Sequence, residues 1–202
     1  MPRDKTVSHA RVLAAARDEF LQYGYEGASM RRIGKNAGMT AAGIYRHCDD
    51  KAALFAELVQ PAVDRIEEWQ RAHMARNTAV MDAGAAAFWQ ESEIDLMREI
   101  IYPHMEEYRL LLTSAEGTAY EGFVSGLVER NTNEMLALLP LLRETGYPVR
   151  EIDTRELRLL LSAYTNALFE PVLHEYGQDE ALRYLDTVAA FFLPGWKQLL
   201  GF

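Results

Sequence analysis

Residues 29–51, with the sequence SMRRIGKNAGMTAAGIYRHCDDK, limit what this chain can fold into more than any other part of it. Ser29 is a favourable N-cap residue. Three apolar residues then recur at the three- and four-residue spacing of one helix face, namely Met30, Ile33 and Ala37. The stretch therefore predicts a short amphipathic helix that begins just after Ser29.

A tight turn and a second short helix are expected to follow. Gly38 suits the left-handed residue that ends a helix, because glycine adopts this conformation at the least cost. Thr40 then caps a helix over 41–47, with Ile44 on its inner side. Two short helices joined by a glycine-containing turn are typical of a helix-turn-helix, and we expect Phe20 to complete their core.

The second helix has the chemistry of a helix that enters a groove. Its first turn consists of the small residues Ala41, Ala42 and Gly43, so the backbone can approach a partner closely. Hydrogen-bond donors and cations follow, namely Tyr45, Arg46, His47 and Lys51. Donors of this kind bind phosphate oxygens, which position a protein on DNA, whereas small or bidentate side chains read base edges. The alternative is a pair of amphipathic helices in an ordinary α-bundle.

Residues 8–59 resemble the N-terminal domain of the tetracycline-repressor (TetR/AcrR) family of bacterial transcription regulators. The resemblance rests on VLAAARDEFLQYGYEGASM, on IGKNAGMTAAGIYRHCDDK and on LFAELV, and it covers about a quarter of the chain. The most specific element is Y-x-H-x-x-x-K, formed by Tyr45, His47 and Lys51. Where the family usually has an aromatic residue after the histidine, this chain has Cys48.

The resemblance implies roles for particular residues. The matching Tyr45, His47 and Lys51 hold the DNA backbone, and the matching Arg31 reaches the groove. It also implies a homodimer that binds double-stranded operator DNA and a small-molecule effector. With Thr40, Ala41, Ala42 and Arg46 from the second helix, these residues make up the predicted DNA-binding set.

The distribution of charge agrees with this interpretation. The net charge of −9 conflicts with DNA binding, which depends on cations. However, residues 1–51 carry nine Lys/Arg and six Asp/Glu, a net charge of +3, whereas the remainder carries twelve and twenty-four, a net charge of −12. Only the first quarter is suited to a phosphate surface, so we divide the chain into a DNA-binding domain (1–51) and a helical body (52–202).

The rest of the pattern is helical throughout, without a β-hairpin signal or a repeat. The helices that we expect lie at 8–24, from 51 to about 76, 79–103 with a kink or end at Pro103, 104–114, 119–144, from 153 or 154 to about 176, and 178–200 with a bend at 194–195. No apolar run is long enough to span a membrane, and no secretory signal precedes the first helix. We therefore expect a cytoplasmic all-α protein.

The last two helices carry continuous apolar stripes. These comprise Leu157, Leu160, Leu161, Tyr164, Leu168 and Val172, then Leu182, Leu185, Val188, Ala189 and Phe192. Part of each stripe must pack within its own subunit. Proteins of the resembled family usually pair these helices into an intermolecular bundle, so we favour a homodimer over a purely intramolecular core.

The middle of the body is rich in aromatic and methionine residues, which line most ligand sites together with a few polar groups. The predicted effector site consists of Phe88, Tyr102, His104, Met105, Tyr120, Phe123, Asn166 and Glu170, and its ligand is expected to be apolar and ring-containing. The alternative for each residue is an ordinary place in the core.

Other chemistry is poorly supported. One cysteine excludes an internal disulfide, and we expect Cys48 to be a small buried residue rather than a redox switch. The pairs His104/Glu107 and Glu170/His174 lack the Glu-x-x-His motifs of a carboxylate-bridged metal site. No phosphate loop or catalytic arrangement is present, so we expect no cofactor, metal or reaction.

The sequence therefore predicts a one-component transcription regulator, with repression as its favoured mode. Two rival interpretations remain open. One is a helical-bundle enzyme or metal-binding protein with a relic DNA-binding domain. The other is a protein-interaction adaptor that uses the acidic body.

Overall fold

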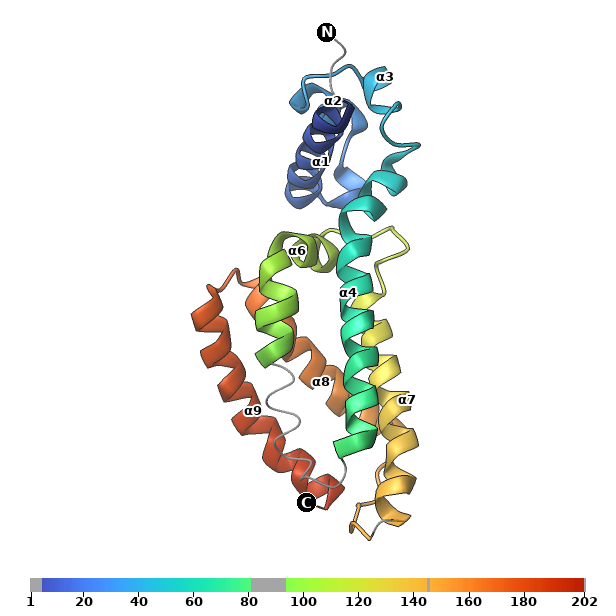
Figure 1. The fold of residues 1–202 in the computed structure, drawn as a ribbon, viewed down its shortest axis with the longest axis vertical. Helices are drawn as coiled ribbons and strands as arrows, with labels where there is room; N and C mark the ends of the chain where they lie inside the picture. The colour runs from blue at the N-terminus through green and yellow to red at the C-terminus, as the bar shows by residue number, and fades with distance from the viewer. Residues whose placement is uncertain (1–4, 81–93, 145, 202) are drawn as a thin grey trace. The chain divides into compact units, whose positions relative to one another are not determined.

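The computed structural model describes residues 5–80, 94–144 and 146–201, and every regular element in these ranges is a helix (Figure 1). The elements are α1 (Lys5–Gly27), α2 (Met30–Asn36), α3 (Ala41–Ile44), α4 (Lys51–Val80), a π-helical turn η1 (Leu96–Ile101), a 3₁₀ turn η2 (Tyr102–His104), α6 (Met105–Thr113), α7 (Phe123–Glu144), α8 (Thr154–Leu173) and α9 (Gln178–Leu200). The predicted all-α fold class is confirmed.

The chain divides into two compact units, each made of two separate stretches of the sequence. The first comprises Met1–Ile66 with His104–Glu121, and the second comprises Glu67–Pro103 with Gly122–Phe202. The helix α4 contributes to both units. The division after residue 51, between a DNA-binding domain and a helical body, was inferred from charge and stays a prediction.

The first unit is built on the predicted small core. Phe20, Ile33 and Ile44 are fully buried, as is Phe55 of α4, whose ring meets that of Phe20 edge-on at 5.0 Å between centroids. The helix α1 begins at Lys5, three residues before the predicted start. It is interrupted at the predicted residue, Gly24, where the backbone has φ 68° and ψ 172°.

In the second unit, the start of α7 and the end of α8 differ from the predicted positions. The α7 helix begins at Phe123 instead of 119, because the Thr118 hydroxyl accepts from the Tyr120 N–H and holds that segment in a turn. The α8 helix ends at Leu173, short of the predicted 176, where Glu175 takes a left-handed φ of 55°. The predicted Asp153 cap is confirmed, since its carboxylate accepts from the Arg155 N–H at 2.8 Å.

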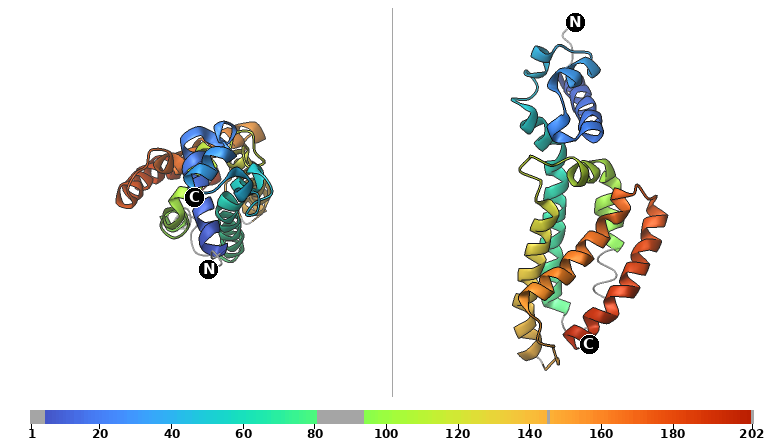
Figure 2. Two further views of the ribbon diagram at one scale, coloured as in Figure 1. Left: turned by 90° about the horizontal axis from the view of Figure 1, so that it is seen from above. Right: turned by 180° about the vertical axis from the view of Figure 1, so that it is seen from behind.

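The core of the second unit lies among α7, α8 and α9, where α8 contacts both α7 and α9 (Figures 1 and 2). Its buried members are Met135, Leu139, Leu142, Leu157, Leu161, Tyr164, Val188, Trp196 and Leu200. The predicted stripes therefore face mainly inward.

Several large apolar side chains on α8 and α9 remain at the surface of this unit. The exposed fractions are 64% for Leu159, 44% for Leu160 and 78% for Phe191. Val188, which sequence alone could equally place at a subunit interface, is 6% exposed and belongs to the intramolecular core. Among the described helices, none has the length and hydropathy needed to cross a membrane.

Candidate nucleic-acid interface

The turn between α2 and α3 has the geometry that the sequence predicts. Gly38 adopts a φ of +68°, and a Cβ placed there would touch nothing within 4 Å, so the left-handed backbone alone favours glycine. The N–H groups of Gly38 and Met39 return to the carbonyls of Lys35 and Gly34, at 3.1 and 2.8 Å, and close the end of α2. The predicted helix-turn-helix is confirmed.

The second helix is shorter than predicted. Thr40 caps it, its hydroxyl accepting from the Gly43 N–H at 3.1 Å, but regular α-helix ends at Ile44. The expected extent of 41–47 is therefore wrong for the last three residues. They continue as a turn in which the His47 N–H reaches the Ile44 carbonyl at 2.6 Å, the tighter spacing common at helix ends.

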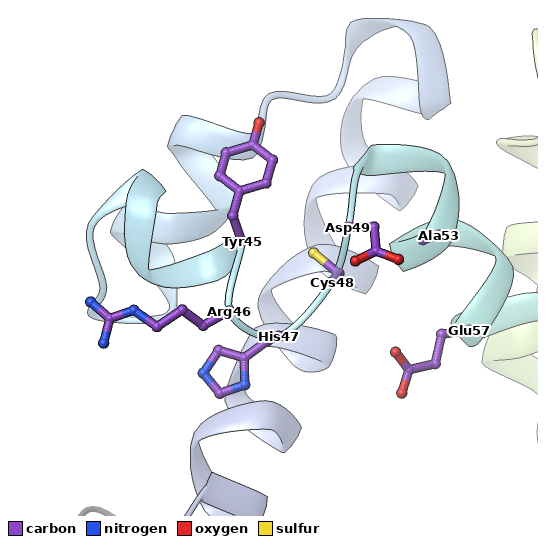
Figure 3. A pocket seen from close by; sticks show the side chains of 7 residues that line it. All are labelled: Tyr45, Arg46, His47, Cys48, Asp49, Ala53 and Glu57. Carbon is purple, nitrogen blue, oxygen red and sulfur yellow. The ribbon is translucent and has the colours of Figure 1, made fainter.

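The turn leaves two of the predicted contact residues in solvent. Tyr45 is 54% exposed, and Arg46 extends away from the turn in Figure 3. Ala42 and Arg31 are also exposed, the latter on α2, whereas the side chain of Ala41 lies outside the described residues. The structure thus brings polar and small residues to the surface of α2, α3 and the following turn.

A cavity of about 300 Å³ opens beside this turn (Figure 3). It is lined by Tyr45, Arg46, His47, Cys48, Asp49, Ala53 and Glu57. Burial raises the pKa of the Cys48 thiol, and the carboxylates of Asp50, Glu57 and Asp49 raise it further. Cys48 is half-buried instead of buried as predicted, and the raised pKa favours the unreactive thiol over the thiolate.

His47 is half-buried on the inner side of the turn. Its ring centroid lies 5.7 Å from that of His9 on α1, and the His9 Nε2 meets the Glu57 carboxylate of α4 at 2.6 Å. These contacts link the start of α1, the recognition turn and α4. They fix the direction of the imidazole that the family resemblance assigns to a phosphate.

Lys51, the third member of the predicted backbone-binding element, points into the first unit. Its ammonium donates to the carbonyls of Tyr25, Glu26 and Ala28, at 2.7, 3.3 and 3.3 Å. It also lies 4.4 Å from the centroid of the Tyr25 ring, within cation–π distance.

A buried carboxylate that sequence reasoning missed anchors the start of α2. Glu19 is 2% exposed and accepts from the Ser29 N–H at 2.8 Å and from the Arg32 Nε at 2.6 Å. Ser29 occupies the predicted N-cap position, but its hydroxyl makes no capping bond, so Glu19 of α1 serves as the cap. The signal was present in the sequence, since Glu19 lies seven residues after Val12, on the buried stripe of α1.

The sequence and the structure were compared with those of known proteins. The model of the family described as bacterial regulatory proteins, tetR family, matches residues 12–58. That range contains the Glu19 anchor, the helix-turn-helix and the start of α4. Residues 12–58 are therefore similar to the N-terminal domain of this family.

The HTH-type transcriptional repressor AcnR of Corynebacterium efficiens is 38% identical to this chain over 66 residues. The alignment covers 32% of this chain and 35% of AcnR, so the match spans about a third of that relative.

Solved structures resemble the chain over nearly its whole length. A TetR transcriptional regulator family member from Streptomyces coelicolor A3 has a TM-score of 0.61 at 21% identity, covering 94% of this chain and 89% of that one. The fatty acid degradation regulator FadR from Bacillus halodurans has a TM-score of 0.59 at 16% identity, covering 96% and 98%. At these identities the likeness shows a shared fold.

The predicted effector residues fall in both compact units. His104, Met105 and Tyr120 belong to the first, and Tyr102, Phe123, Asn166 and Glu170 belong to the second, whereas Phe88 lies outside the described residues. The effector site therefore stays a prediction.

Several polar groups of this predicted set already have hydrogen-bond partners within their own unit. The Tyr120 hydroxyl donates to the Gln60 side chain at 2.6 Å, and the Tyr102 hydroxyl donates to the Tyr176 carbonyl at 2.8 Å. Asn166 is exposed and donates to a carbonyl one turn earlier on α8. These bonds occupy groups that we expected to orient a ligand.

The members of the two His/Glu pairs lie within contact distance of each other. His104 lies 3.4 Å from Glu107, and His174 lies 3.0 Å from Glu170. Within the described residues no group of three or more His, Cys, Asp or Glu side chains could hold a metal ion.

Proposed function

We propose that this chain is a homodimeric one-component transcription regulator that represses by binding a palindromic operator and is released by a small apolar ligand. One observation carries the proposal: the tetR-family match coincides with a helix-turn-helix whose outer surface presents Arg31, Tyr45 and Arg46 to solvent. The related AcnR proteins are themselves described as repressors. Such a regulator acts in the cytoplasm and requires no catalytic reaction.

Charge favours DNA over other partners for the first domain. Arg31, Lys35 and Arg46 are exposed and, among the residues that the structure describes, form no ion pair or side-chain hydrogen bond. Cations without internal partners can neutralise phosphates and release counterions, which is the main source of affinity for DNA. The acidic remainder of the chain repels the same phosphates and thereby limits contact to this domain.

The dimer follows from the apolar surface of α8 and α9. Leu159 and Leu160 on α8 and Phe191 on α9 are exposed, and a second chain that covered them would bury their apolar surface. A second copy of the chain supplies the same surface, and the resulting dyad gives two recognition helices for successive major grooves.

The effector acts by preferring the form of the protein that is free of DNA. By linkage, a ligand that weakens operator affinity a hundredfold is itself bound about a hundredfold less tightly in the operator complex, a coupling of about 2.7 kcal/mol. Equal ligand affinity with and without operator would mean that the ligand does not regulate DNA binding.

The proposal is tested by selecting fragments of the encoding genome on the purified protein and measuring their affinity by fluorescence anisotropy at several salt concentrations. We expect affinity to fall steeply with salt, and Arg46→Ala to reduce the slope of log affinity against log salt by about two per dimer, one for each subunit. Arg98→Ala, an exposed arginine of the second unit, is the matched control and should leave the slope unchanged. Retention of no fragment, or binding that ignores salt, would overturn the proposal.

A further inference from the structure

The ammonium of Lys51 has no donor left for DNA. A lysine ammonium carries three hydrogens, and three carbonyls surround this one, those of Tyr25, Glu26 and Ala28. The Tyr25 ring lies against the same group, at 4.4 Å from nitrogen to centroid. Lys51 is half-buried, in contrast with the exposed cations of α2 and the recognition turn.

The carbonyls that Lys51 binds belong to a segment that needs partners. Gly24 interrupts α1, so the carbonyls that follow lack the regular partners of a continuing helix. Arg32 completes the set, because its Nη2 donates to the Gly27 carbonyl at 2.6 Å. Two cations thus bind four successive carbonyls, at 25–28, between α1 and α2.

This arrangement connects the parts that aim the helix-turn-helix. Lys51 is the first residue of α4, and the clamped segment leads directly into α2 at Ser29. The buried Glu19 holds both Arg32 and the Ser29 N–H, so α1, α2 and α4 meet at one hydrogen-bonded network within the first unit. Loss of Lys51 would release the start of α4 from this network.

We propose that Lys51 is a positioning residue that sets the direction of the helix-turn-helix, and that Lys35 and Arg46 make the phosphate contacts in its place. The proposal rests on the proposed DNA-binding function and reassigns the role that the family resemblance gives to Lys51. Lys35 is exposed in the last turn of α2, and Arg46 is exposed after α3, so both cations are available without breaking an internal bond.

Two substitutions of Lys51 separate the possible roles. Lys51→Met removes the charge, whereas Lys51→Arg keeps it but replaces three converging N–H groups with a planar fork. For a positioning residue, both variants should weaken operator binding by about tenfold while the slope against salt stays at the wild-type value. Lys35→Met and Arg46→Met should instead each lower the slope by about two per dimer and leave the melting temperature unchanged.

Labelling of the wild-type protein gives a second measurement that no folding defect can disturb. Amine acetylation followed by mass spectrometry should modify Lys51 slowly both with and without operator DNA. Lys35 should be modified rapidly in the free protein and slowly in the complex.

The results that overturn the inference differ from those that overturn the function. If Lys51→Arg retains wild-type affinity while Lys51→Met lowers the salt slope by about two per dimer, Lys51 is a phosphate contact. Protection of Lys51 from acetylation only when DNA is bound would likewise identify it as a phosphate contact. Wild-type protein that binds no DNA overturns the proposed function itself.

Discussion

Glu19 should be the most sensitive polar residue of the first domain to substitution. Its carboxylate is 2% exposed and carries two tasks, since it caps α2 through the Ser29 N–H and neutralises Arg32. Glu19→Leu fits the apolar surroundings of α1 but removes both. The expected result is a destabilised start of α2, the helix that carries Arg31.

The size of the effect follows from the groups left behind. The Ser29 N–H loses its acceptor, which costs about 1–3 kcal/mol if water does not replace it. Arg32 has a side chain that is 45% exposed, so its guanidinium can turn to solvent when Glu19 is removed. The free energy of unfolding should therefore fall by about 1–3 kcal/mol, through the Ser29 N–H.

Arg32→Leu should cost at least as much, although Arg32 is the more exposed partner. It leaves the buried carboxylate of Glu19 unpaired, and stranding a buried charge costs about 3–5 kcal/mol. The double variant removes the charge as well as its partner. The Ser29 N–H then lacks its acceptor, and the Gly27 carbonyl lacks its donor as it already does in Arg32→Leu, so the double variant should be no less stable than Arg32→Leu alone.

Urea denaturation of the wild type, the two single variants and the double variant measures this coupling as a double-mutant cycle. We expect the double variant to lose at least about 2 kcal/mol less than the sum of the single losses. Glu116→Leu, an exposed acid of the first unit, is the control and should change stability by less than about 0.5 kcal/mol. Additive losses for Glu19 and Arg32 would refute the reasoning.

Three further predictions concern other parts of the chain. Phe191→Glu should yield folded monomers in analytical ultracentrifugation, whereas Val188→Glu, inside the core, should unfold the second unit; a folded Phe191→Glu dimer would exclude this surface as the interface. Burial raises the pKa of Glu134 above its usual 4.5 despite nearby Arg130, so the contribution of Glu134 to stability is present below about pH 4.5 and is lost as pH rises. Glu134→Gln should therefore raise the melting temperature at pH 7 but not at pH 4. A gain in melting temperature that is independent of pH would contradict this cause. Gly38→Ala should cost about 1–2 kcal/mol in urea denaturation through its left-handed backbone alone, and a neutral result would contradict the strain argument.

The features that could be predicted from the sequence are those set by neighbouring residues. Gly38 and Thr40 fix the turn through their own backbone and side chain, and both lie where the sequence places them. The inward residues Phe20, Ile33 and Ile44 follow from helical periodicity and are fully buried. Local chemistry therefore sufficed for the helix-turn-helix and its core.

The features that could not be predicted depend on contacts distant in sequence. Lys51 looks like a free cation in the sequence, and only the return of the chain near Tyr25 shows where its three hydrogens go. Ser29 looks like a self-sufficient cap, although a carboxylate ten residues earlier does its work. Periodicity likewise could not tell which side of α8 and α9 faces its own core, as Val188 and Phe191 illustrate.

A hydroxyl-radical footprint on a genomic fragment selected by the protein tests the central claim most directly, because it reports each protected sugar along both strands. For a dimeric helix-turn-helix regulator we expect two protected patches related by a dyad, with centres about one helical turn of DNA apart or a multiple of that distance. Protection should fade as salt rises, and Arg46→Ala should weaken both patches equally. A single patch without symmetry, or uniform protection regardless of sequence, would contradict the account.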